Sequence, residues 1–198
     1  MSCRTICVFC GSQGGRRPEY AEAAREFAQI AAKRGVALVF GGGHVGLMGA
    51  LADAALENGG RIIGVIPRHL MRPEVAHRRL TELLIVESMH ERKRTMAERS
   101  DAFVVLPGGY GTLEEMFEMV TWLQLQLQSK PVGILNIEHF YDPLLDFLKH
   151  AADEGFIRPE HWDLLIVEHS GQLLLERLEL HAAALSRTHP RKSDLSRG

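Results

Sequence analysis

Short apolar runs alternate along this chain with longer segments in which apolar residues recur at helical spacing. The runs are four to six residues long and carry few polar side chains, which is typical of strands buried on both faces. Predicted strands cover residues 5–10, 37–40, 61–66, 83–86, 102–106, 132–135 and 164–167. Predicted helices cover residues 18–34, 45–56, 89–100, 112–125, 141–154 and 172–185.

This alternation predicts an α/β fold. Buried strands that are separated by helices form a mainly parallel sheet with helices on both faces, so we expect a Rossmann-like three-layer sandwich. A chain of 198 residues with 45% hydrophobic residues is long enough for one sizeable core. We therefore expect a single nucleotide-binding catalytic domain over residues 1–185. Residues 186–198 are polar apart from one leucine, and we expect a disordered tail there.

Charge and hydropathy narrow the choice of partners. The chain has 23 Lys and Arg against 25 Asp and Glu, a formal net charge of -2, so no overall field attracts nucleic acid or an anionic membrane. No stretch approaches the roughly 20 apolar residues of a membrane span, and the polar start lacks the apolar core of a signal peptide. We expect a cytoplasmic protein that binds neither nucleic acid nor membrane.

Cysteine and histidine give little support for a metal site. Cys3, Cys7 and Cys10 are the only cysteines, and the CxxC formed by the last two lacks the second pair that a zinc site needs. On a strand their thiols point to opposite faces, so we expect buried, reduced thiols, with a redox or metal role as the alternative. The ten histidines show no ligand spacing. We predict no structural metal.

The strongest candidate site follows the predicted strand at 102–106, where residues 107–115 read Pro-Gly-Gly-Tyr-Gly-Thr-Leu-Glu-Glu. Glycines let backbone N–H groups face an anion, and the helix that follows adds positive potential at its N-terminus. This pattern favours a phosphorylated ligand with Glu115 as the nearest carboxylate. Thr112 and Glu115 also fit a capping box, in which Glu115 only closes its own helix, and the residues alone leave both readings open.

A second glycine turn, Gly-Gly-Gly-His-Val-Gly at residues 41–46, also joins a strand to a helix. It matches the dinucleotide fingerprint GxGxxG, but no acidic residue follows at the tip of the next strand, so a nicotinamide or flavin cofactor is disfavoured. The turn either contacts a phosphate or ribose or is a plain tight turn. We expect no cofactor, and no GxxxxGK[ST] loop occurs.

The segment Met89-His90-Glu91-Arg92-Lys93 opens the helix before the candidate loop. In a parallel sheet this helix begins at the edge where the glycine loops emerge, so we expect Arg92 and Lys93 to face a ligand. Cations near a helix N-terminus are mildly unfavourable, which suggests a compensating anion or carboxylate. The alternative is a solvated charged face.

Taken together, the two glycine loops and the Glu-Arg-Lys segment resemble the LONELY GUY family, whose members are cytokinin riboside 5'-monophosphate phosphoribohydrolases often mislabelled lysine decarboxylases. The resemblance runs in order over residues 5–136 and more loosely to 185. It implies that Glu115 and Arg92 are the catalytic pair, and that the protein is a homodimer. The implied substrate-binding residues, to which we add Ser12, Gly42 and Gly43 from the glycine loops, are Glu74, Lys93, Gly108, Gly109, Tyr110, Gly111, Thr112, Leu113, Glu114 and Thr121.

The resemblance implies hydrolysis of the N-glycosidic bond of a cytokinin nucleoside 5'-monophosphate to free base and ribose 5-phosphate. Two alternatives stay open: a broader phosphoribohydrolase that acts on AMP, and a nucleotide sensor without turnover. Decarboxylation fits poorly, because pyridoxal phosphate needs a Schiff-base lysine and only Lys93 lies near the predicted site.

Overall fold

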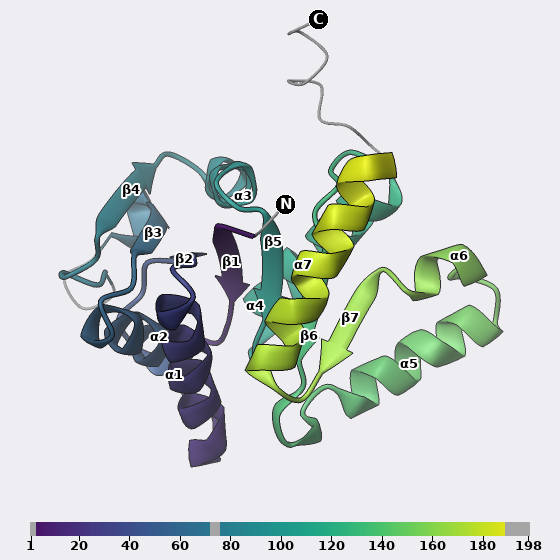
Figure 1. Ribbon diagram of the computed structural model, residues 1–198, viewed down its shortest axis with the longest axis horizontal. Helices are drawn as coiled ribbons and strands as arrows, with labels where there is room; N and C mark the ends of the chain where they lie inside the picture. Colours follow the sequence, from purple (N-terminus) through teal and green to yellow (C-terminus); the bar gives the residue numbers. More distant parts are fainter. Residues whose placement is uncertain (1–2, 72–75, 189–198) are drawn as a thin grey trace, which may run out of the picture.

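The computed structural model describes residues 3–71 and 76–188, and within them seven strands form one parallel sheet. The strands lie side by side in the order β4-β3-β2-β1-β5-β6-β7 (Figure 1). Their bounds are β1 Thr5–Phe9, β2 Ala37–Phe40, β3 Ile62–Pro67, β4 Glu82–Val86, β5 Ala102–Val105, β6 Val132–Leu135 and β7 Leu165–Glu168. The predicted α/β sandwich with a parallel sheet is confirmed.

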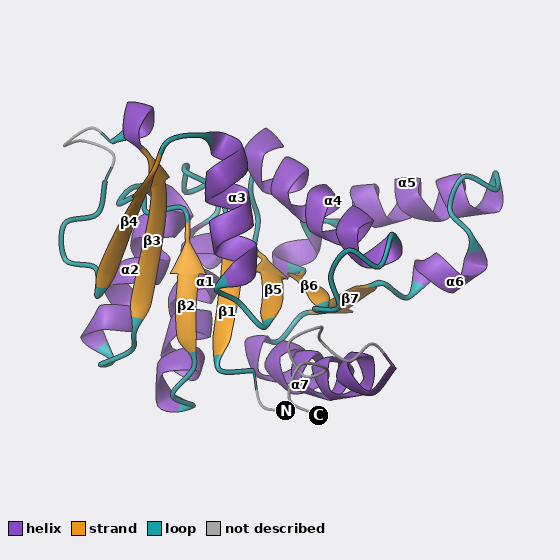
Figure 2. Ribbon diagram, turned by 90° about the horizontal axis from the view of Figure 1, so that it is seen from above, coloured by secondary structure: helices purple, strands orange, loops and turns teal. Residues whose placement is uncertain are grey.

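Helices cover both faces of this sheet. Their bounds are α1 Pro18–Lys33, α2 Gly46–Glu57, α3 Met89–Glu98, α4 Tyr110–Gln124, α5 Asp142–Asp153, α6 Pro159–Trp162 and α7 Gly171–Thr188, with 3-10 helices at Arg68–Leu70 and Ile137–His139. One core layer packs α1, α2 and α7 against the sheet, and the other packs α3, α4 and the start of α5. Figure 2 shows α7 on the opposite side of the sheet from α3 and α4.

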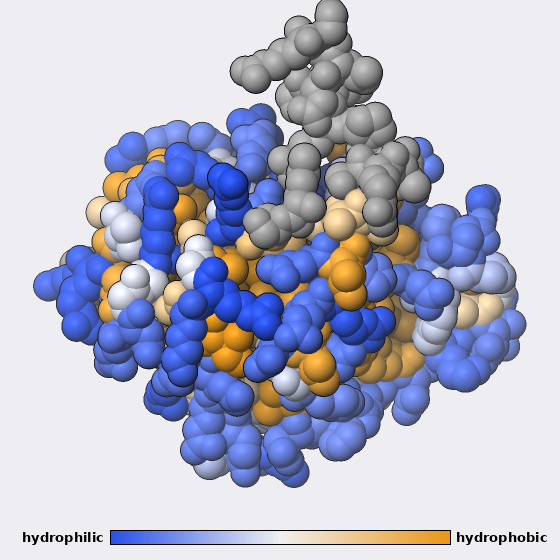
Figure 3. Space-filling view, in the orientation of Figure 1, coloured by the Kyte–Doolittle hydropathy of each residue, from blue (hydrophilic) through white to orange (hydrophobic). Residues whose placement is uncertain are grey.

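The two core layers follow directly from the strand period of two. Ile6 and Val8 of β1 enter the layer with α1, whereas Cys7 and Phe9 enter the layer with α3. The three cysteines are buried and free, and Cys7 and Cys10 lie in different layers. Figure 3 shows the face that carries α7, where hydrophobic residues gather in the middle and hydrophilic residues cover the periphery.

Several boundaries differ from the sequence prediction. Helix α4 begins at Tyr110 with Gly109 as its N-cap, so Thr112 lies inside the first turn and does not cap the helix as expected. Helix α7 continues to Thr188, three residues beyond the expected boundary, and residues 189–198 lie outside the described part of the chain. The helix α6 was not predicted, because its four residues are too few to show a helical repeat.

The direction in which the chain builds the sheet reverses between β1 and β5. From β1 the chain adds β2, β3 and β4 on one side, and it then returns to add β5, β6 and β7 on the other side of β1. In parallel α/β sheets, ligands bind at such a point, outside the carboxyl ends of the strands. The loops after β1 and β5 meet there, since the Gly11 N–H donates to the Pro107 carbonyl oxygen at 3.0 Å. The fold therefore brings the candidate loop 107–109 to the expected ligand-binding edge.

None of the helices in the described part of the chain combines the length and the apolar character that a membrane crossing requires.

Candidate active site

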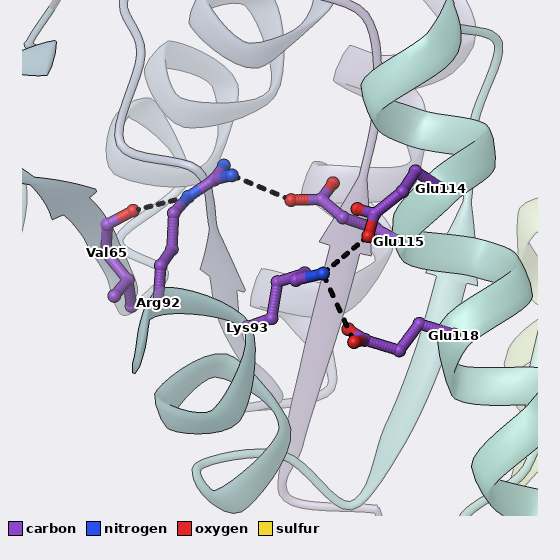
Figure 4. Close-up of polar contacts among 6 residues, drawn as sticks. All are labelled: Val65, Arg92, Lys93, Glu114, Glu115 and Glu118. Atoms are coloured by element: carbon purple, nitrogen blue, oxygen red, sulfur yellow. Dashed lines mark hydrogen bonds and ion pairs between the residues drawn. The ribbon is translucent and has the colours of Figure 1, made fainter. Parts of the chain in front are cut away.

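Arg92 and Glu115 form an ion pair between α3 and α4. The Nη1 of Arg92 donates to Oε1 of Glu115 at 2.8 Å, and only 12% and 9% of the two side chains are exposed (Figure 4). A second donor of the same guanidinium, Nε, binds the carbonyl oxygen of Val65 in β3 at 3.1 Å. The guanidinium is thus held between a strand and the carboxylate, which fixes the aim of both side chains.

This pairing rejects the capping-box role of Glu115. Its carboxylate accepts from α3 and not from the first turn of its own helix, where Gly109 is an N-cap without a side-chain hydrogen bond. The physical reason is that α4 starts two residues before Thr112, so Glu115 lies too deep in the helix to reach the free N–H groups of the first turn. The carboxylate remains available for chemistry.

Burial makes ionisation of Glu115 costly. Desolvation raises the pKa of its carboxyl group above the ordinary value of 4.5, and the nearby Arg92 offsets only part of that effect. The negative charges of Glu114 and Glu118 raise the same pKa further, while Lys93 lowers it. A carboxylate kept in a dry site with one fixed cation is typical of groups that stabilise charge in a reaction.

Lys93 does not lie on a solvated face. Its side chain is 9% exposed, and Nζ donates to Oε1 of Glu114 and, at 3.1 Å, to Oε1 of Glu118. Burial lowers the pKa of Lys93, but the hydrogen bonds with the two carboxylates more than offset this and raise it overall. Lys93 is therefore held as a cation.

The glycine loop is packed on one side and open on the other. A Cβ on Gly108 would lie 2.1 Å from Oγ1 of Thr112 and 3.0 Å from the Gly11 nitrogen, so this position tolerates only glycine. A Cβ on Gly109 or Gly111 would meet nothing within 4 Å, and Tyr110 is 94% exposed. The first N–H groups of α4 have no acceptor within the helix, so this open side offers donors to an anion.

The glycine turn at residues 41–46 has a structural role. Gly42 has a φ of 76° and its carbonyl oxygen accepts from the His77 N–H at 2.9 Å, while Gly43 forms an antiparallel bridge with Ala76. The side chain of His77 is itself buried and contacts Asp53 of α2 at 3.2 Å. The turn holds residues 76–77 in place. The contact between His77 and Asp53 joins residues that are 24 positions apart, and no local sequence pattern predicts it.

The remaining predicted contacts are dispersed. Ser12 is exposed in the loop after β1, whose backbone packs against Gly46 at the start of α2. Thr121 is exposed on α4 whereas Glu115 is buried, as their helical offset predicts, so the two side chains lie on different sides of the helix. Glu74 lies outside the described residues. Leu113 is half-buried in the first turns of α4.

Glu118 was missed by the sequence analysis. It lies four residues after Glu114 on α4, a spacing that places both carboxylates on one side of the helix and within reach of a single cation. Among the described residues, no group of three or more His, Cys, Asp or Glu side chains is arranged to hold a metal ion. The charged side chains described between α3 and α4 are the cations Arg92 and Lys93 and the carboxylates Glu114, Glu115 and Glu118.

Comparison with known proteins connects this geometry to one group of enzymes. A protein-family profile described as "Possible lysine decarboxylase" matches residues 48–178. The chain is 45% identical over 188 residues to a probable cytokinin riboside 5'-monophosphate phosphoribohydrolase of Oryza sativa subsp. japonica, and the match covers 95% of this chain and 84% of the rice protein. A cytokinin riboside 5'-monophosphate phosphoribohydrolase of Arabidopsis thaliana is 44% identical over 90% of this chain and 78% of its own length.

Solved structures share the fold. The molybdenum cofactor carrier protein from Chlamydomonas reinhardtii has a TM-score of 0.67 at 22% identity, over 90% of this chain and 98% of that one. The molybdenum cofactor binding protein from Rippkaea orientalis also gives 0.67, at 21% identity over 91% and 98% of the two chains. At these identities the likeness extends to the fold alone.

Proposed function

The chain belongs to the LONELY GUY family of cytokinin riboside 5'-monophosphate phosphoribohydrolases, and we propose that the Arg92–Glu115 pair is the centre of its chemistry. The reaction of such an enzyme is hydrolysis of the N-glycosidic bond of a nucleoside 5'-monophosphate, which yields free base and ribose 5-phosphate. The observation that carries the assignment of the pair is its burial at the carboxyl edge of the sheet, beside the glycine loop.

The phosphate binds at the open side of the glycine loop. The first N–H groups of α4, at Tyr110, Gly111 and Thr112, have no acceptor within the helix, and the helix dipole favours negative charge there. A phosphate held at this turn places the ribose over the following turn of the same helix. Glu115 belongs to that turn, so its carboxylate lies beneath the sugar.

Glu115 then acts on the anomeric carbon. As the N-glycosidic bond lengthens, this carbon gains oxocarbenium character, and a carboxylate below it stabilises the positive charge and orients the attacking water. Arg92 favours the ionised form of the carboxylate and fixes its orientation, because the guanidinium binds Val65 and Glu115 together. The sequence left open whether Arg92 pairs with Glu115 or grips the substrate, and the contact at 2.8 Å supports the first role.

The decarboxylase description of the matching profile does not suit this site. Pyridoxal phosphate requires a lysine whose neutral amine forms a Schiff base. Lys93 is the lysine of this cluster, and its hydrogen bonds with Glu114 and Glu118 raise its pKa, which keeps it protonated. The residues present do not fit that cofactor.

A homodimer is part of the proposal. Leu125 and Leu127, just after α4, are 58% and 70% exposed, and Phe147 of α5 is 62% exposed. Apolar side chains of this size in water favour burial against a second copy. Thr121 is exposed on α4, on a different side of the helix from Glu115. It would therefore contact substrate only in a site that two subunits form together.

The cytoplasm is the proposed compartment. All three cysteines are buried and unpaired, which suits a reducing environment.

The assay that tests the proposed function measures free base after incubation of the purified protein with AMP and with isopentenyladenosine 5'-monophosphate. Release from the prenylated nucleotide in preference to AMP supports cytokinin activation, and equal release supports the broader phosphoribohydrolase. Nucleotide binding without release of base from either substrate would overturn the enzymatic role and leave a sensor.

A further inference from the structure

Two successive residues of α3 face three carboxylates of α4. Arg92 binds Glu115, and Lys93 binds Glu114 and Glu118 (Figure 4). Two cations against three carboxylates leave the cluster with one excess negative charge when all five groups are ionised. Both cations and Glu115 are largely buried, so water screens the charges around Glu115 only weakly, whereas Glu114 is 54% exposed and is screened more strongly.

Glu118 is the member of the cluster with a buried oxygen that lacks a hydrogen-bond partner among the described residues. Its Oε1 accepts from Lys93 at 3.1 Å, whereas its Oε2 is a buried atom without a hydrogen-bond partner among the described residues. An under-satisfied carboxylate in a dry environment acts strongly on its charged neighbours. The neighbour that matters is Glu115, three residues earlier on the same helix.

We propose that Lys93 and Glu118 are positioning residues that tune the charge on Glu115, Lys93 through its ion pairs with Glu114 and Glu118. This inference rests on the proposed function of Glu115. The resemblance to the family implied a substrate contact for Lys93, but its ammonium group is already engaged by two carboxylates. These bonds use two of the three N–H donors of the ammonium group.

The charged groups that face Glu115 come from two elements. Arg92 and Lys93 of α3 favour its ionised form, and Glu114 and Glu118 of α4 oppose it. The thiols of Cys7 and Cys10 also lie near, but burial raises the pKa of both, so they stay neutral in the range where Glu115 ionises. The sign of each charged group therefore predicts how its removal moves the titration of Glu115.

A net negative cluster also suits the reaction. Positive charge develops on the ribosyl carbon in the transition state, and a fixed negative charge that is already in place stabilises it without reorganisation. Complete neutralisation of the three carboxylates would lose this advantage. Glu118 thus increases the negative potential at the site, and Lys93 limits it so that Glu115 still ionises.

The test is the pH dependence of kcat/KM for base release, from about pH 5 to about pH 9, because its acidic limb reports the ionisation of Glu115 in the free enzyme. The variants are Lys93→Met and Glu118→Gln, with Lys149→Met as the matched control. Lys149 lies on α5, where it pairs with Asp153 in solvent. The substrate is whichever nucleotide the wild-type protein cleaves.

Lys93→Met removes a cation and leaves two carboxylates unpaired, so the pKa of Glu115 rises and the acidic limb moves up by about half a pH unit or more. Glu118→Gln removes an opposing negative charge, so the limb moves down by about the same amount. Lys149→Met leaves the limb in place. Because Glu118→Gln conserves shape, it gives a readout even if Lys93→Met does not fold.

Other outcomes overturn the inference. An increase in KM for Lys93→Met with an unmoved acidic limb would make Lys93 a substrate ligand, as the family resemblance implies. If kcat fell in both variants while the acidic limb of the pH profile stayed in place, the cluster would have a purely structural role. Absence of base release by the wild-type protein would instead contradict the proposed function itself.

Discussion

Gly41 lies directly beneath the guanidinium of Arg92: a Cβ built on Gly41 would be 2.2 Å from Nη2 of Arg92. Gly41 follows β2, and Arg92 reaches it from α3 while it binds Val65 and Glu115. The guanidinium can occupy this position only because Gly41 has no side chain. The glycine turn after β2 supports the active site through Arg92 as well as through residues 76–77.

Gly41→Ala should impair catalysis with little effect on the fold. The atoms that the new methyl group meets are the ends of flexible side chains, Arg92 and Met48, so they can move aside. We expect kcat/KM to fall about tenfold or more, because the guanidinium is displaced from its position at Glu115, while the free energy of unfolding falls by about 1–2 kcal/mol because the buried ion pair is weakened but not removed. Enzyme kinetics and denaturant titration measure the two effects.

Gly14→Ala is the matched control for this prediction, because a Cβ at Gly14 meets nothing within 4 Å and the residue is not in the left-handed region. It should leave kcat/KM near the wild-type value. Equal kinetic losses in both variants would contradict the specific role of Gly41.

Arg92→Ala should damage both stability and activity. It leaves the carboxylate of Glu115 buried without its cation, which costs about 2–4 kcal/mol in the free energy of unfolding. Arg92 lowers the pKa of Glu115, so its removal should move the acidic limb of kcat/KM to higher pH. Urea denaturation and a pH-rate profile give the two readouts, and an acidic limb that moves to lower pH would exclude the proposed role of Arg92.

Tyr141→Phe should loosen the end of β5. The buried hydroxyl of Tyr141 donates to the Leu106 carbonyl oxygen at 2.8 Å, one residue before the candidate loop. Its loss leaves a buried acceptor unpaired and should cost about 1–2 kcal/mol in the free energy of unfolding. Tyr110→Phe, at a residue that is 94% exposed, is the control for stability. Equal stabilities of the two variants in thermal denaturation would show that the Tyr141 bond contributes nothing.

Ionisation of Glu115 should destabilise the folded state. Because burial raises the pKa of Glu115 above 4.5 in the folded protein, the native state retains this proton at pH values where the unfolded chain has lost it. The contribution of Glu115 to stability is therefore complete below pH 4.5 and is lost as pH rises through the raised pKa. Denaturation of the wild-type protein and of Glu115→Gln across this range should show a smaller decline with pH in the variant. An identical decline in both proteins would contradict the raised pKa.

The sequence predicted the layers of the fold well because the signal is local. Continuously apolar strands and periodic helices specify a parallel sheet, and the carboxyl edge of that sheet then places α3 beside the glycine loop. This rule predicts that Arg92 faces the ligand-binding edge, whereas its role beside Glu115 was implied by the family resemblance and their contact was left open. Their contact at 2.8 Å joins residues that are 23 positions apart in the chain.

The details that failed depend on packing between distant segments. Thr112 has the chemistry of a cap, yet its hydroxyl packs against Gly108, and α4 starts two residues earlier. The partners of Lys93 depend on the rotation of α4 relative to α3, which no propensity specifies. The contact of His77 with Asp53 likewise depends on how a loop crosses α2. Such relationships require the tertiary structure.

The central claim is that the Glu115 carboxylate stabilises the developing charge at the anomeric carbon, and Glu115→Gln tests it most directly. Gln keeps the size and an acceptor for Arg92, and we expect the free energy of unfolding at neutral pH to change by about 1 kcal/mol or less. The decisive measurement is kcat/KM for release of free base by wild type and variant, with near-UV circular dichroism to confirm the fold. The account predicts a loss of about a hundredfold or more in the folded variant. Base release at a rate near that of the wild type would contradict it.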